Sequence, residues 1–542
     1  MPDPLATPPS PHPIPLAGSR PIGASDAPAR PNLSRVIAAL LLLATFAGCL
    51  WMYTRHNAFP YEYHPDEGGK ALQILSVDGR RNFNHPQLML EATQWATHWL
   101  ATPADPQAVV VVGRTVSATF AALAVVSLAL CGYLAGGLAG LIAVAPLVAL
   151  SPYLLAYTHV MKEDATLVFG VAVSVLGARL LWNWGRRPVL QWVAVVVLAG
   201  GTAAAASAKY VGVVTVVLAL LALVGAPNAS RFTALLRPVV FLSYAMLLVL
   251  VINHRVLDNL DGFARGLERE IDHSLTEHSG LTMAKPNTYA ADTTLEQTFP
   301  HARALLAVGL LLAIGWWRSR PRLGWDRCVW VFAALFLAVL SYSVIPMQRY
   351  ALPVALMGAL LAGVAAVRVG QFIGRPWARW GVPLATAAVT IGWQGPRCAD
   401  YVAQFRDDSR QQLREFILND PTMRGARVWS EGYVGLDYPP YHGGDDGLSA
   451  YVAEIHTPFS AGEAGSLESL RQRGYTHIAV ADIAYARYLD RRVIPTPSFQ
   501  YGYARRRRFY EQLFAEGTLI WSREARYPMQ AYTNPTIRLY RL

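Results

Sequence analysis

Charged residues are scarce in this sequence. Asp, Glu, Lys and Arg make up 15% of its 542 residues, whereas hydrophobic residues make up 53%. An average soluble domain is roughly 25% charged. Apolar runs such as Val109–Leu130 and Val239–Ile252 suit helices that cross a bilayer core, which takes about 20 residues per crossing. The shortage of charge therefore excludes an ordinary soluble protein and indicates insertion into a membrane.

Cysteine is equally rare, with four in the chain. Cys49, Cys131 and Cys328 lie in or at the ends of apolar runs, and Cys398 stands alone. This distribution provides neither a disulfide framework nor the ligand spacing of a zinc site. We interpret the four cysteines as small apolar side chains that fill space between helices.

A stripe of Lys and Arg interleaved with aromatic residues is also missing, although the net charge is +11. The basic residues form short clusters between apolar runs, which is how membrane proteins encode their orientation. We therefore expect no nucleic-acid partner, and we expect the charge to mark loops on the cytoplasmic side.

The apolar runs predict a polytopic α-helical membrane protein with about eleven transmembrane helices. The expected spans are residues 35–53, 109–130, 134–154, 163–182, 190–206, 209–225, 238–253, 302–317, 328–345, 350–368 and 379–394. Residues 1–34 are rich in Pro, Ala and Ser, which predicts a disordered cytoplasmic tail. Span one is too far along the chain to belong to a cleaved signal peptide.

The arginine clusters give the expected orientation. Four loops on one side hold Arg186 and Arg187, Arg231 and Arg237, Arg318 to Arg327, and Arg368 to Arg379. A cytoplasmic amino terminus places all four inside. The domain 35–396 then has external loops at 54–107 and 254–300, and 397–542 forms an external soluble domain. We expect a bacterial inner (plasma) membrane as its location.

The external parts contain further predicted elements. In the loop 54–107, the patterns Ala71–Val77 and Leu88–Leu100 predict amphipathic helices that lie in the membrane interface. In 397–542, helices are expected at Asp408–Asn419 and Ser466–Arg473. Strands are expected at Arg427–Ser430, Thr476–Ala481 and Thr536–Leu542. Alternation of helices with strands predicts a small α/β domain.

Asp66 and Glu67 follow the first span as an adjacent pair of carboxylates. Two interpretations are open at this point. Asp66 is either a helix cap at the start of the pattern Ala71–Val77, or a general base at the membrane face, a role worth roughly 10²–10⁴-fold in rate.

Other polar groups fall on the same side under this topology. His85 lies in the first loop, Lys162 and Asp164 lie between spans three and four, and Lys209 lies between spans five and six. Arg349 and Tyr350 precede the tenth span. Polar residues at one membrane face are typical of a functional site, although each one alone is also compatible with a solvated helix end.

Taken in order, these motifs resemble the GT-C superfamily of membrane glycosyltransferases. The likeness covers approximately residues 35–394 and is strongest to the branch of protein mannosyltransferases and the bacterial lipid A aminoarabinose transferase (glycosyltransferase family 39-like). The residues that carry it are His64-Pro65-Asp66-Glu67, Asn84-His85-Pro86-Gln87-Leu88, Lys162-Glu163-Asp164, Lys209-Tyr210 and Arg349-Tyr350-Ala351-Leu352-Pro353. His85-Pro86-Gln87 replaces a double proline of many relatives, and Gly68-Gly69 replaces bulkier residues. Both departures leave the substrate open.

The resemblance implies an inverting hexosyl or pentosyl transfer from a polyprenyl-phosphate sugar donor to an acceptor hydroxyl. Asp66, Glu67 and Asp164 are the implied catalytic residues, with Asp66 as the base and Asp164 orienting the acceptor or a metal. The implied substrate-binding residues are His85, Lys162, Lys209, His278, Arg349 and Tyr350. The acceptor is a lipid, protein or glycan. The resemblance fixes no cofactor and requires no nucleotide-binding fold, and a divalent metal stays open.

A multispan transporter or lipid flippase is the alternative, because it is also polytopic and positive inside. Transporters place charged groups and broken helices near the middle of the membrane and show repeated halves. In this sequence, the charged clusters lie at span ends and no repeat is visible. A membrane protein whose external domain only binds a partner is a third possibility.

Overall fold

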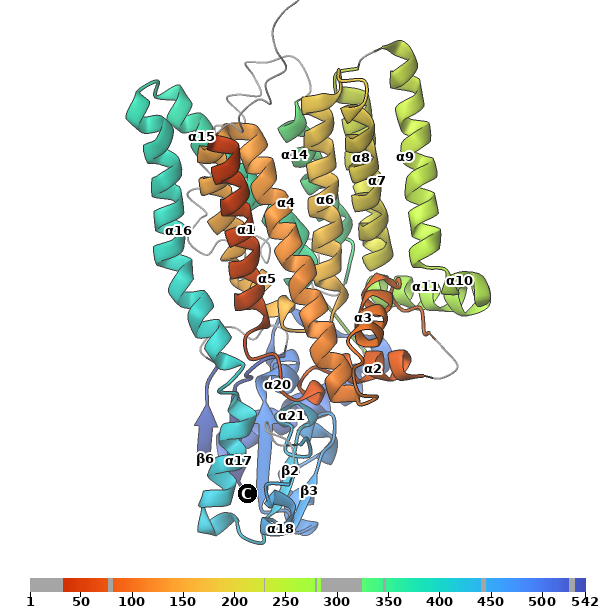
Figure 1. The fold of residues 1–542 in the computed structure, drawn as a ribbon. Coiled ribbons are helices and arrows are strands. Elements are labelled where there is room, and N and C mark those ends of the chain that lie inside the picture. The colour runs from red at the N-terminus through yellow and green to blue at the C-terminus, as the bar shows by residue number, and fades with distance from the viewer. Residues whose placement is uncertain are drawn as a thin grey trace, which may run out of the picture.

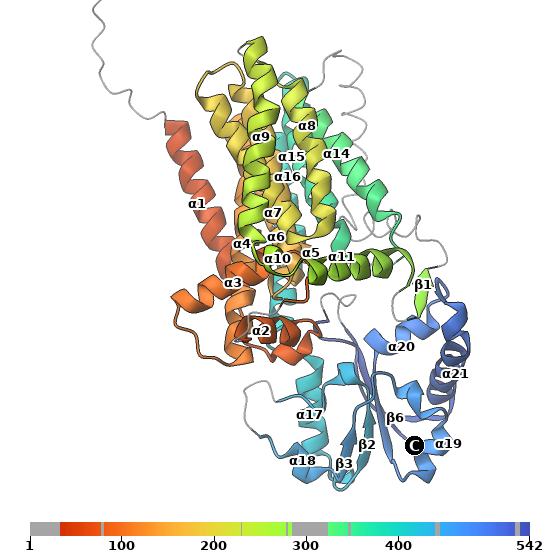
Figure 2. The ribbon, with the colours of Figure 1, turned by 90° about the vertical axis from the view of Figure 1, so that its right-hand side faces the viewer.

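The structure, a computed structural model, describes residues 33–76, 81–228, 230–277, 280–283, 324–344, 348–439, 445–525 and 532–542. A bundle of long helices forms one part, and a small domain with a β-sheet packs against one end of that bundle (Figure 1). We call this end the domain-facing end. Short helices lie across it, between the two parts (Figure 2).

Six described helices are long and apolar enough to cross a membrane: α1 (Leu33–Thr54), α4 (Pro106–Ala149), α6 (Glu163–Trp184), α7 (Leu190–Ala208), α9 (Arg231–Ile252) and α15 (Leu352–Phe372) together with the 3₁₀ turn η3 (Gln348–Ala351). Shorter or less apolar helices complete the bundle: α5 (Pro152–Thr158), η2 (Tyr210–Val214), α8 (Thr215–Gly225), α14 (Trp325–Leu340) and α16 (Pro376–Gln404). The predicted polytopic helical class is confirmed. The expected span 302–317 lies outside the described residues.

Helix α4 accounts for two of the expected spans. Its backbone leaves helical geometry at Gly136 and Gly137, and Gly137 has a φ of 63°. A positive φ is costly for residues with a Cβ, so glycine permits the break. Helix α16 runs on to Gln404, which carries it through the domain boundary expected at residue 397.

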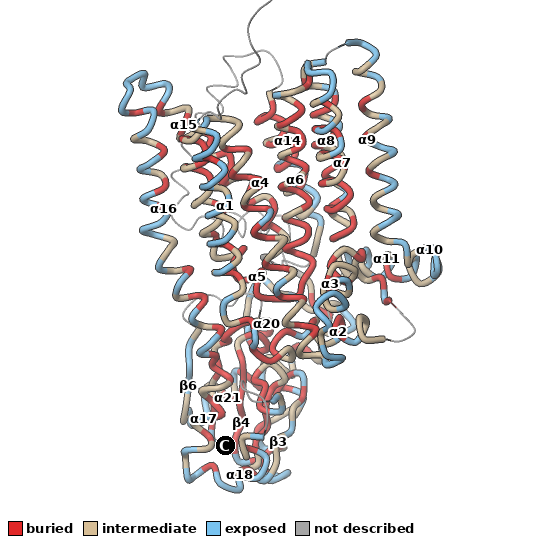
Figure 3. Tube along the Cα trace, viewed as in Figure 1, coloured by how far each residue is buried: buried red, intermediate tan, exposed pale blue. Residues whose placement is uncertain are grey.

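Small residues let α6 and α7 pack closely. A Cβ atom added to Gly170 would lie 2.2 Å from the backbone nitrogen of Ala205, and one added to Gly177 would lie 2.4 Å from that of Leu198. Such contacts are typical of helices that associate within a membrane. The outer faces of α1 and α9 are exposed, whereas α6 is buried along most of its length (Figure 3). The close packing brings the start of α6 beside the end of α7.

Four short helices cover the domain-facing end: α2 (Glu67–Leu75), α3 (Leu88–Trp99), α10 (Arg255–Asp258) and α11 (Leu260–Leu275) (Figure 2). The interface helices expected at 71–77 and 88–100 correspond to α2 and α3. Helix α3 buries Met89 and Leu90, while Trp95 and Trp99 stay exposed. This distribution is that of an amphipathic helix at a membrane surface.

The C-terminal domain has a five-stranded sheet in the order β3-β2-β4-β7-β6. Its strands are β2 (Arg427–Ser430), β3 (Glu454–His456), β4 (His477–Ala481), β6 (Thr518–Arg523) and β7 (Ile537–Arg541), and its helices are α17 (Ser409–Asn419), α18 (Leu448–Tyr451), α19 (Leu467–Gln472), α20 (Asp482–Leu489) and α21 (Gln500–Glu516). Strand β2 is parallel to β3 and β4, and β7 is antiparallel to β4 and β6. The predicted α/β class is confirmed.

One strand pair joins the two parts of the molecule. Strand β1 (Leu281–Met283) pairs antiparallel with β5 (Val493–Pro495), with Thr282 opposite Ile494. The Thr496 amide also donates to the Gly280 carbonyl at 2.9 Å. The segment after α11 is thereby tied to the C-terminal domain. Three-residue strands are too short to give a periodic signal, so the sequence did not predict this pair.

The C-terminal domain contains a buried carboxylate at the end of β2. Glu431 accepts hydrogen bonds from the amides of Ala461 (3.1 Å) and Ala481 (2.7 Å) and from the Tyr510 hydroxyl. Burial raises the pKa of Glu431 to about 7, although these donors oppose the rise. Between the ordinary pKa of a glutamate, roughly 4.3, and pH 7, the folded domain therefore holds a proton that the unfolded chain releases.

The raised pKa of Glu431 leads us to expect that the stability of the protein depends on pH. The contribution of this carboxyl group is fully present below the unfolded pKa of roughly 4.3 and is lost as the pH rises through about 7. We expect the thermal midpoint of the purified protein to fall between pH 5 and pH 8. The fall should be shallower in Glu431→Gln, whose absolute midpoint is lower because one amide loses its acceptor. Differential scanning fluorimetry measures both, and exposed Glu415→Gln is the control. Equal slopes in Glu431→Gln and wild type would contradict the assignment.

Candidate active site

Charged side chains from five separate segments meet at the domain-facing end of the bundle. They come from the loop before α2, from α2 itself, from the start of α6, from the break after α7 and from η3. We call this group the ion-pair cluster; its members are Asp66, Lys70, Lys162, Glu163, Asp164, Lys209 and Arg349. It contains four cations and three carboxylates, which leaves an excess of positive charge.

Asp66 forms an ion pair with Lys162. It stands at the N-cap position of α2, yet its side chain accepts no hydrogen bond from a described amide at that helix start. The capping interpretation therefore does not describe this residue. The Asp66 side chain is 42% exposed while that of Lys162 is 4% exposed. Burial favours the neutral acid, but Lys162 and His64 hold the pKa of Asp66 below its usual range.

Asp164 binds two cations at once. Lys209 Nζ lies 2.5 Å from its Oδ1, and Arg349 Nε lies 3.8 Å from its Oδ2. Lys209 also lies 4.7 Å above the ring of Tyr350, a cation–π contact. Asp164 Oδ2 and Arg349 Nε form no hydrogen bond with any described group. Two buried polar atoms are thus available to a ligand at this point.

Lys70 and Glu163 form a third pair that the sequence reasoning did not assign to the site. His85 Nε2 lies 4.0 Å from Glu163 Oε2, which makes no hydrogen bond with described residues. The rarity of lysine was a sequence signal that could have pointed to Lys70. Only four of the 47 basic residues are lysines, and three of these four lie in the ion-pair cluster. Burial, followed by the neighbouring Lys162, lowers the pKa of Lys70 well below its usual value.

Glu67 points away from this cluster although it is adjacent to Asp66. Its fully buried carboxylate accepts from Arg114 Nε (2.9 Å) and Nη2 (2.5 Å) and from the Met161 amide (2.7 Å). Arg114 also donates to the carbonyls of Asn57 (2.7 Å) and Phe59 (2.5 Å). Both carboxylate oxygens of Glu67 are therefore engaged in holding the loop, whereas its expected catalytic role stays a prediction.

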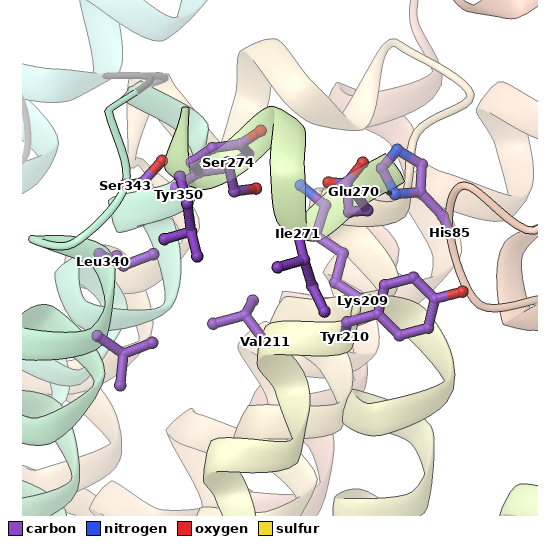
Figure 4. Close-up of a pocket in the computed structure, with 12 residues that line it drawn as sticks. His85, Lys209, Tyr210, Val211, Glu270, Ile271, Ser274, Leu340, Ser343 and Tyr350 are labelled. Carbon is purple, nitrogen blue, oxygen red and sulfur yellow. Dashed lines mark ion pairs between the residues drawn. The ribbon is translucent and has the colours of Figure 1, made fainter. Parts of the chain in front are cut away.

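A cavity of about 240 Å³ opens beside the ion-pair cluster (Figure 4). One end is polar, where His85, Lys209 and Glu270 face one another. The rest is apolar, with walls from η2, α11 and α14 formed by Val211, Ile271, Leu275, Val339 and Leu340. Tyr350 also lines the cavity, so it connects the cluster with the apolar walls. A ligand with an anionic head and a hydrocarbon tail matches this distribution.

Burial shifts the pKa values of two groups at the polar end of the cavity. Burial, followed by Lys162 and Lys70, lowers the pKa of His85 well below its usual value, so its ring is neutral at pH 7. Burial raises the pKa of Glu270, against the pull of Lys209 and Lys162. The shift at Glu270 favours the uncharged acid and so weakens repulsion of an anion beside Lys209, whereas the neutral His85 ring adds no positive charge there.

The structure thus brings together all the described residues that the sequence singled out, with Glu67 facing the opposite side of its loop. His278 lies outside the described residues. Within the described part of the chain, no group of three His, Cys, Asp or Glu side chains is arranged to hold a metal ion. Asp66 and Asp164 are both engaged by cations, so we derive no chemical step through a metal.

Comparisons with known proteins agree with this arrangement at the level of fold. No family model matches the sequence, and no curated protein matches it. ArnT from Cupriavidus metallidurans, bound to undecaprenyl phosphate, is similar with a TM-score of 0.50 and 12% identity, over 93% of this chain and 97% of that chain.

Two other solved structures are similar. The archaeal oligosaccharyltransferase AglB from Archaeoglobus fulgidus, in complex with an inhibitory peptide and a dolichol-phosphate, gives a TM-score of 0.50 at 11% identity, over 82% of this chain and 69% of that one. The protein O-mannosyltransferase Pmt1-Pmt2 complex of S. cerevisiae, bound to the sugar donor, gives 0.36 at 16% identity, over 42% of this chain and 34% of that one. The match thus spans about a third of that relative. The protein shares the GT-C fold, as its motifs predicted.

The different surroundings of the two adjacent carboxylates give a testable contrast. Glu67→Gln leaves the buried Arg114 charge without its carboxylate, which costs roughly 3–5 kcal/mol when a buried pair is broken. We expect a large drop in thermal midpoint and in the yield of folded protein. Asp66→Asn, at the partly exposed neighbour, should lower the midpoint much less, because Asp164 also lies near Lys162. Scanning fluorimetry in detergent measures both, and equal melting of the two variants would contradict the structural role of Glu67.

Proposed function

We propose that this protein is an inverting glycosyltransferase that moves a sugar from a polyprenyl-phosphate carrier to an acceptor hydroxyl at the external membrane face. One observation carries the proposal. The exposed carboxylate of Asp66 stands at the edge of a cationic cluster that opens into a cavity with apolar walls. A base, an anion site and a hydrocarbon site are thereby adjacent, which is what transfer from a lipid phosphate requires.

The donor would bind with its phosphate at the polar end of the cavity. Lys209 supplies a point charge, and the guanidinium of Arg349 supplies a planar pair of donors. The first isoprene units would lie against the walls from α11 and α14, and the rest of the chain would extend into the lipid. Two solved structures with the same fold support this choice, because ArnT is bound to undecaprenyl phosphate and AglB to a dolichol-phosphate.

The reaction would proceed in one displacement. The acceptor oxygen attacks the anomeric carbon, the bond from that carbon to the phosphate oxygen breaks, and its electron pair stays with the phosphate. Asp66 takes the proton of the acceptor hydroxyl, while Lys209 and Arg349 stabilise the charge that develops on the leaving group. Asp164 holds these two cations in place.

Lys162 would be the ion-pair partner of Asp66 in the absence of the donor. Paired with Lys162, the Asp66 carboxylate is fully ionised but a weak base, because the pair lowers its pKa. A donor phosphate that attracts Lys162 would weaken the pair and make Asp66 more basic. The base would then be activated when the donor is bound. The acceptor class stays open among a lipid, a protein and a glycan.

Asp66→Asn tests the role of the base. The amide is nearly isosteric but takes no proton at neutral pH, so transfer from a synthetic polyprenyl-phosphate sugar should fall roughly 10²–10⁴-fold. Binding of the donor should be retained, because the substitution removes a negative charge beside Lys162. Single-turnover transfer and donor binding are measured on the same detergent-purified protein. Asp258→Asn, at an exposed carboxylate on α10, is the matched control. Undiminished transfer in Asp66→Asn would refute the assignment, and a transporter would show no transfer in wild type.

The proposal also requires the domain-facing end to lie outside the cytoplasm. A single cysteine can report this side, because the four native cysteines all lie in the described part and are buried. Gln472 is exposed at the end of α19. Gln472→Cys should react with an impermeant maleimide added to spheroplasts. Protection until the inner membrane is lysed would place the domain in the cytoplasm and overturn the orientation.

A further inference from the structure

The C-terminal domain contacts the loop that carries Asp66, and these contacts have a specific geometry. We propose that Tyr532 is a positioning residue for the transfer step, which acts through His64 to hold the Asp66 loop in its active arrangement. The inference rests on the proposed function and adds to it a role for the C-terminal domain. Figure 2 shows this domain lying beneath α2, on the side where the loop is located.

His64 is the link between the domain and the base. Nδ1 of its buried ring accepts a hydrogen bond from the backbone N–H of Asp66 (3.2 Å). The backbone carbonyl of His64 accepts a hydrogen bond from the backbone N–H of Glu67 (3.2 Å). An accepting Nδ1 places the proton of the neutral ring on Nε2. Burial lowers the pKa of His64 well below its usual value, so the neutral form persists at physiological pH. The orientation of this ring therefore determines where the Asp66 backbone lies.

Tyr532 of the C-terminal domain packs against that ring. The two ring centroids are 5.0 Å apart and the planes are at 86°, an edge-to-face contact. His64 Nε2 forms no hydrogen bond with a described residue. The packing of Tyr532 is thus a contact that restrains this ring. On its other side, Tyr532 stacks on Tyr433, with centroids 5.6 Å apart and an angle of 15°.

The backbone of Tyr532 is held in a conformation that a tyrosine rarely adopts. Its φ is 59°, and the φ of Asn534 is 48°. Positive φ values at residues other than glycine persist where surrounding contacts impose them, and such residues cluster at functional sites. The Tyr532 carbonyl accepts from Arg410 Nη2 (2.8 Å), and the Asn534 amide donates to Asp408 Oδ2 (2.9 Å). These bonds fix the direction of the Tyr532 ring.

Arg410 connects the same structure to the loop a second time. It is buried, pairs with Asp408 at 3.0 Å and donates to the Tyr433 carbonyl at 3.1 Å. Its guanidinium also lies 4.4 Å above the ring of Tyr63, the residue before His64. Two consecutive residues of the loop are therefore held by one rigid corner of the C-terminal domain. The sequence position of Tyr532, 466 residues after Asp66, gives no hint of this contact.

Removal of the Tyr532 ring should affect catalysis more than binding. The proposed donor cavity is lined by residues of the bundle, of α11 and by His85, and by none of the C-terminal domain, so we expect its affinity for the donor to stay intact. A displaced base costs rate, and misplacement by about 1 Å lowers a rate up to roughly a hundredfold. A looser loop also weakens the pair of Asp66 with Lys162, which moves the pKa of Asp66 up towards its ordinary value.

The experiment compares Tyr532→Ala, Tyr532→Phe and wild type in the full-length protein with a synthetic polyprenyl-phosphate sugar. We expect Tyr532→Ala to lower kcat roughly ten- to a hundredfold with little change in KM for the donor. Its acid limb in the pH profile of kcat/KM should move to higher pH. Tyr532→Phe keeps the ring and should behave as wild type. Tyr501→Ala, at an exposed tyrosine of α21, controls for the substitution itself.

A double variant tests whether Tyr532 acts through His64. Because both side chains belong to one relay, His64→Ala with Tyr532→Ala should be no slower than His64→Ala alone. Multiplied losses in the double variant would overturn the relay. Unchanged kcat and pH profile in Tyr532→Ala would overturn the positioning role.

Two outcomes separate this inference from its premises. Tyr532→Leu fills similar space without an aromatic edge. We expect it to lower kcat and to shift the pH profile as Tyr532→Ala does. If neither Tyr532→Ala nor Tyr532→Leu accumulates while Tyr532→Phe does, the ring serves folding and the positioning role is rejected. Wild-type protein that transfers no sugar refutes the proposed function. Active wild type with unaffected Tyr532 variants refutes this inference alone.

Discussion

Charges buried at the end of a helix bundle must be paired, and this constraint shapes the site. Taking an ion out of water costs several kcal/mol unless a partner offsets the loss. In the ion-pair cluster every carboxylate has a cation within reach, and each pair joins two separate segments. The pairs therefore fix the loops in space as well as satisfying the charges. Since four cations face three carboxylates, the same cluster has one more basic side chain than acidic ones, which suits the anion site that we propose.

Helix packing determines which charges meet. The glycines of α6 and α7 allow a close approach, so that Asp164 at the start of one helix reaches Lys209 at the end of the other. On the opposite side, Arg114 of α4 holds Glu67 and the carbonyls of the preceding loop. Asp66 is left between these two anchored regions with a partly exposed carboxylate. The loop is thereby held on both sides of Asp66, which suits the accurate placement that the proposed base requires.

The C-terminal domain is attached to this region at two points. The strand pair β1–β5 ties it to the segment after α11, whose Glu270 and Ile271 line the cavity. The corner built by Asp408 and Arg410 ties it to Tyr63 and His64. One attachment lies beside the cavity and the other beside the loop that carries Asp66. The domain contributes no residue to the ion-pair cluster, so in the proposed reaction it would act through position.

The sequence by itself determined the features that depend on neighbouring residues. Hydropathy gave the spanning helices, amphipathic periodicity gave α2 and α3, and the location of charges at span ends indicated one face for Asp66, Lys162, Lys209 and Arg349. The tertiary structure alone decided which adjacent carboxylate faces the open site, that Lys70 belongs to the cluster, and that Tyr532 reaches His64. The physical reason is that a helix or span follows from contacts a few residues apart, which periodicity records. The partner of a buried charge, such as Arg114 for Glu67, is chosen by packing between segments whose separation along the chain leaves no local pattern.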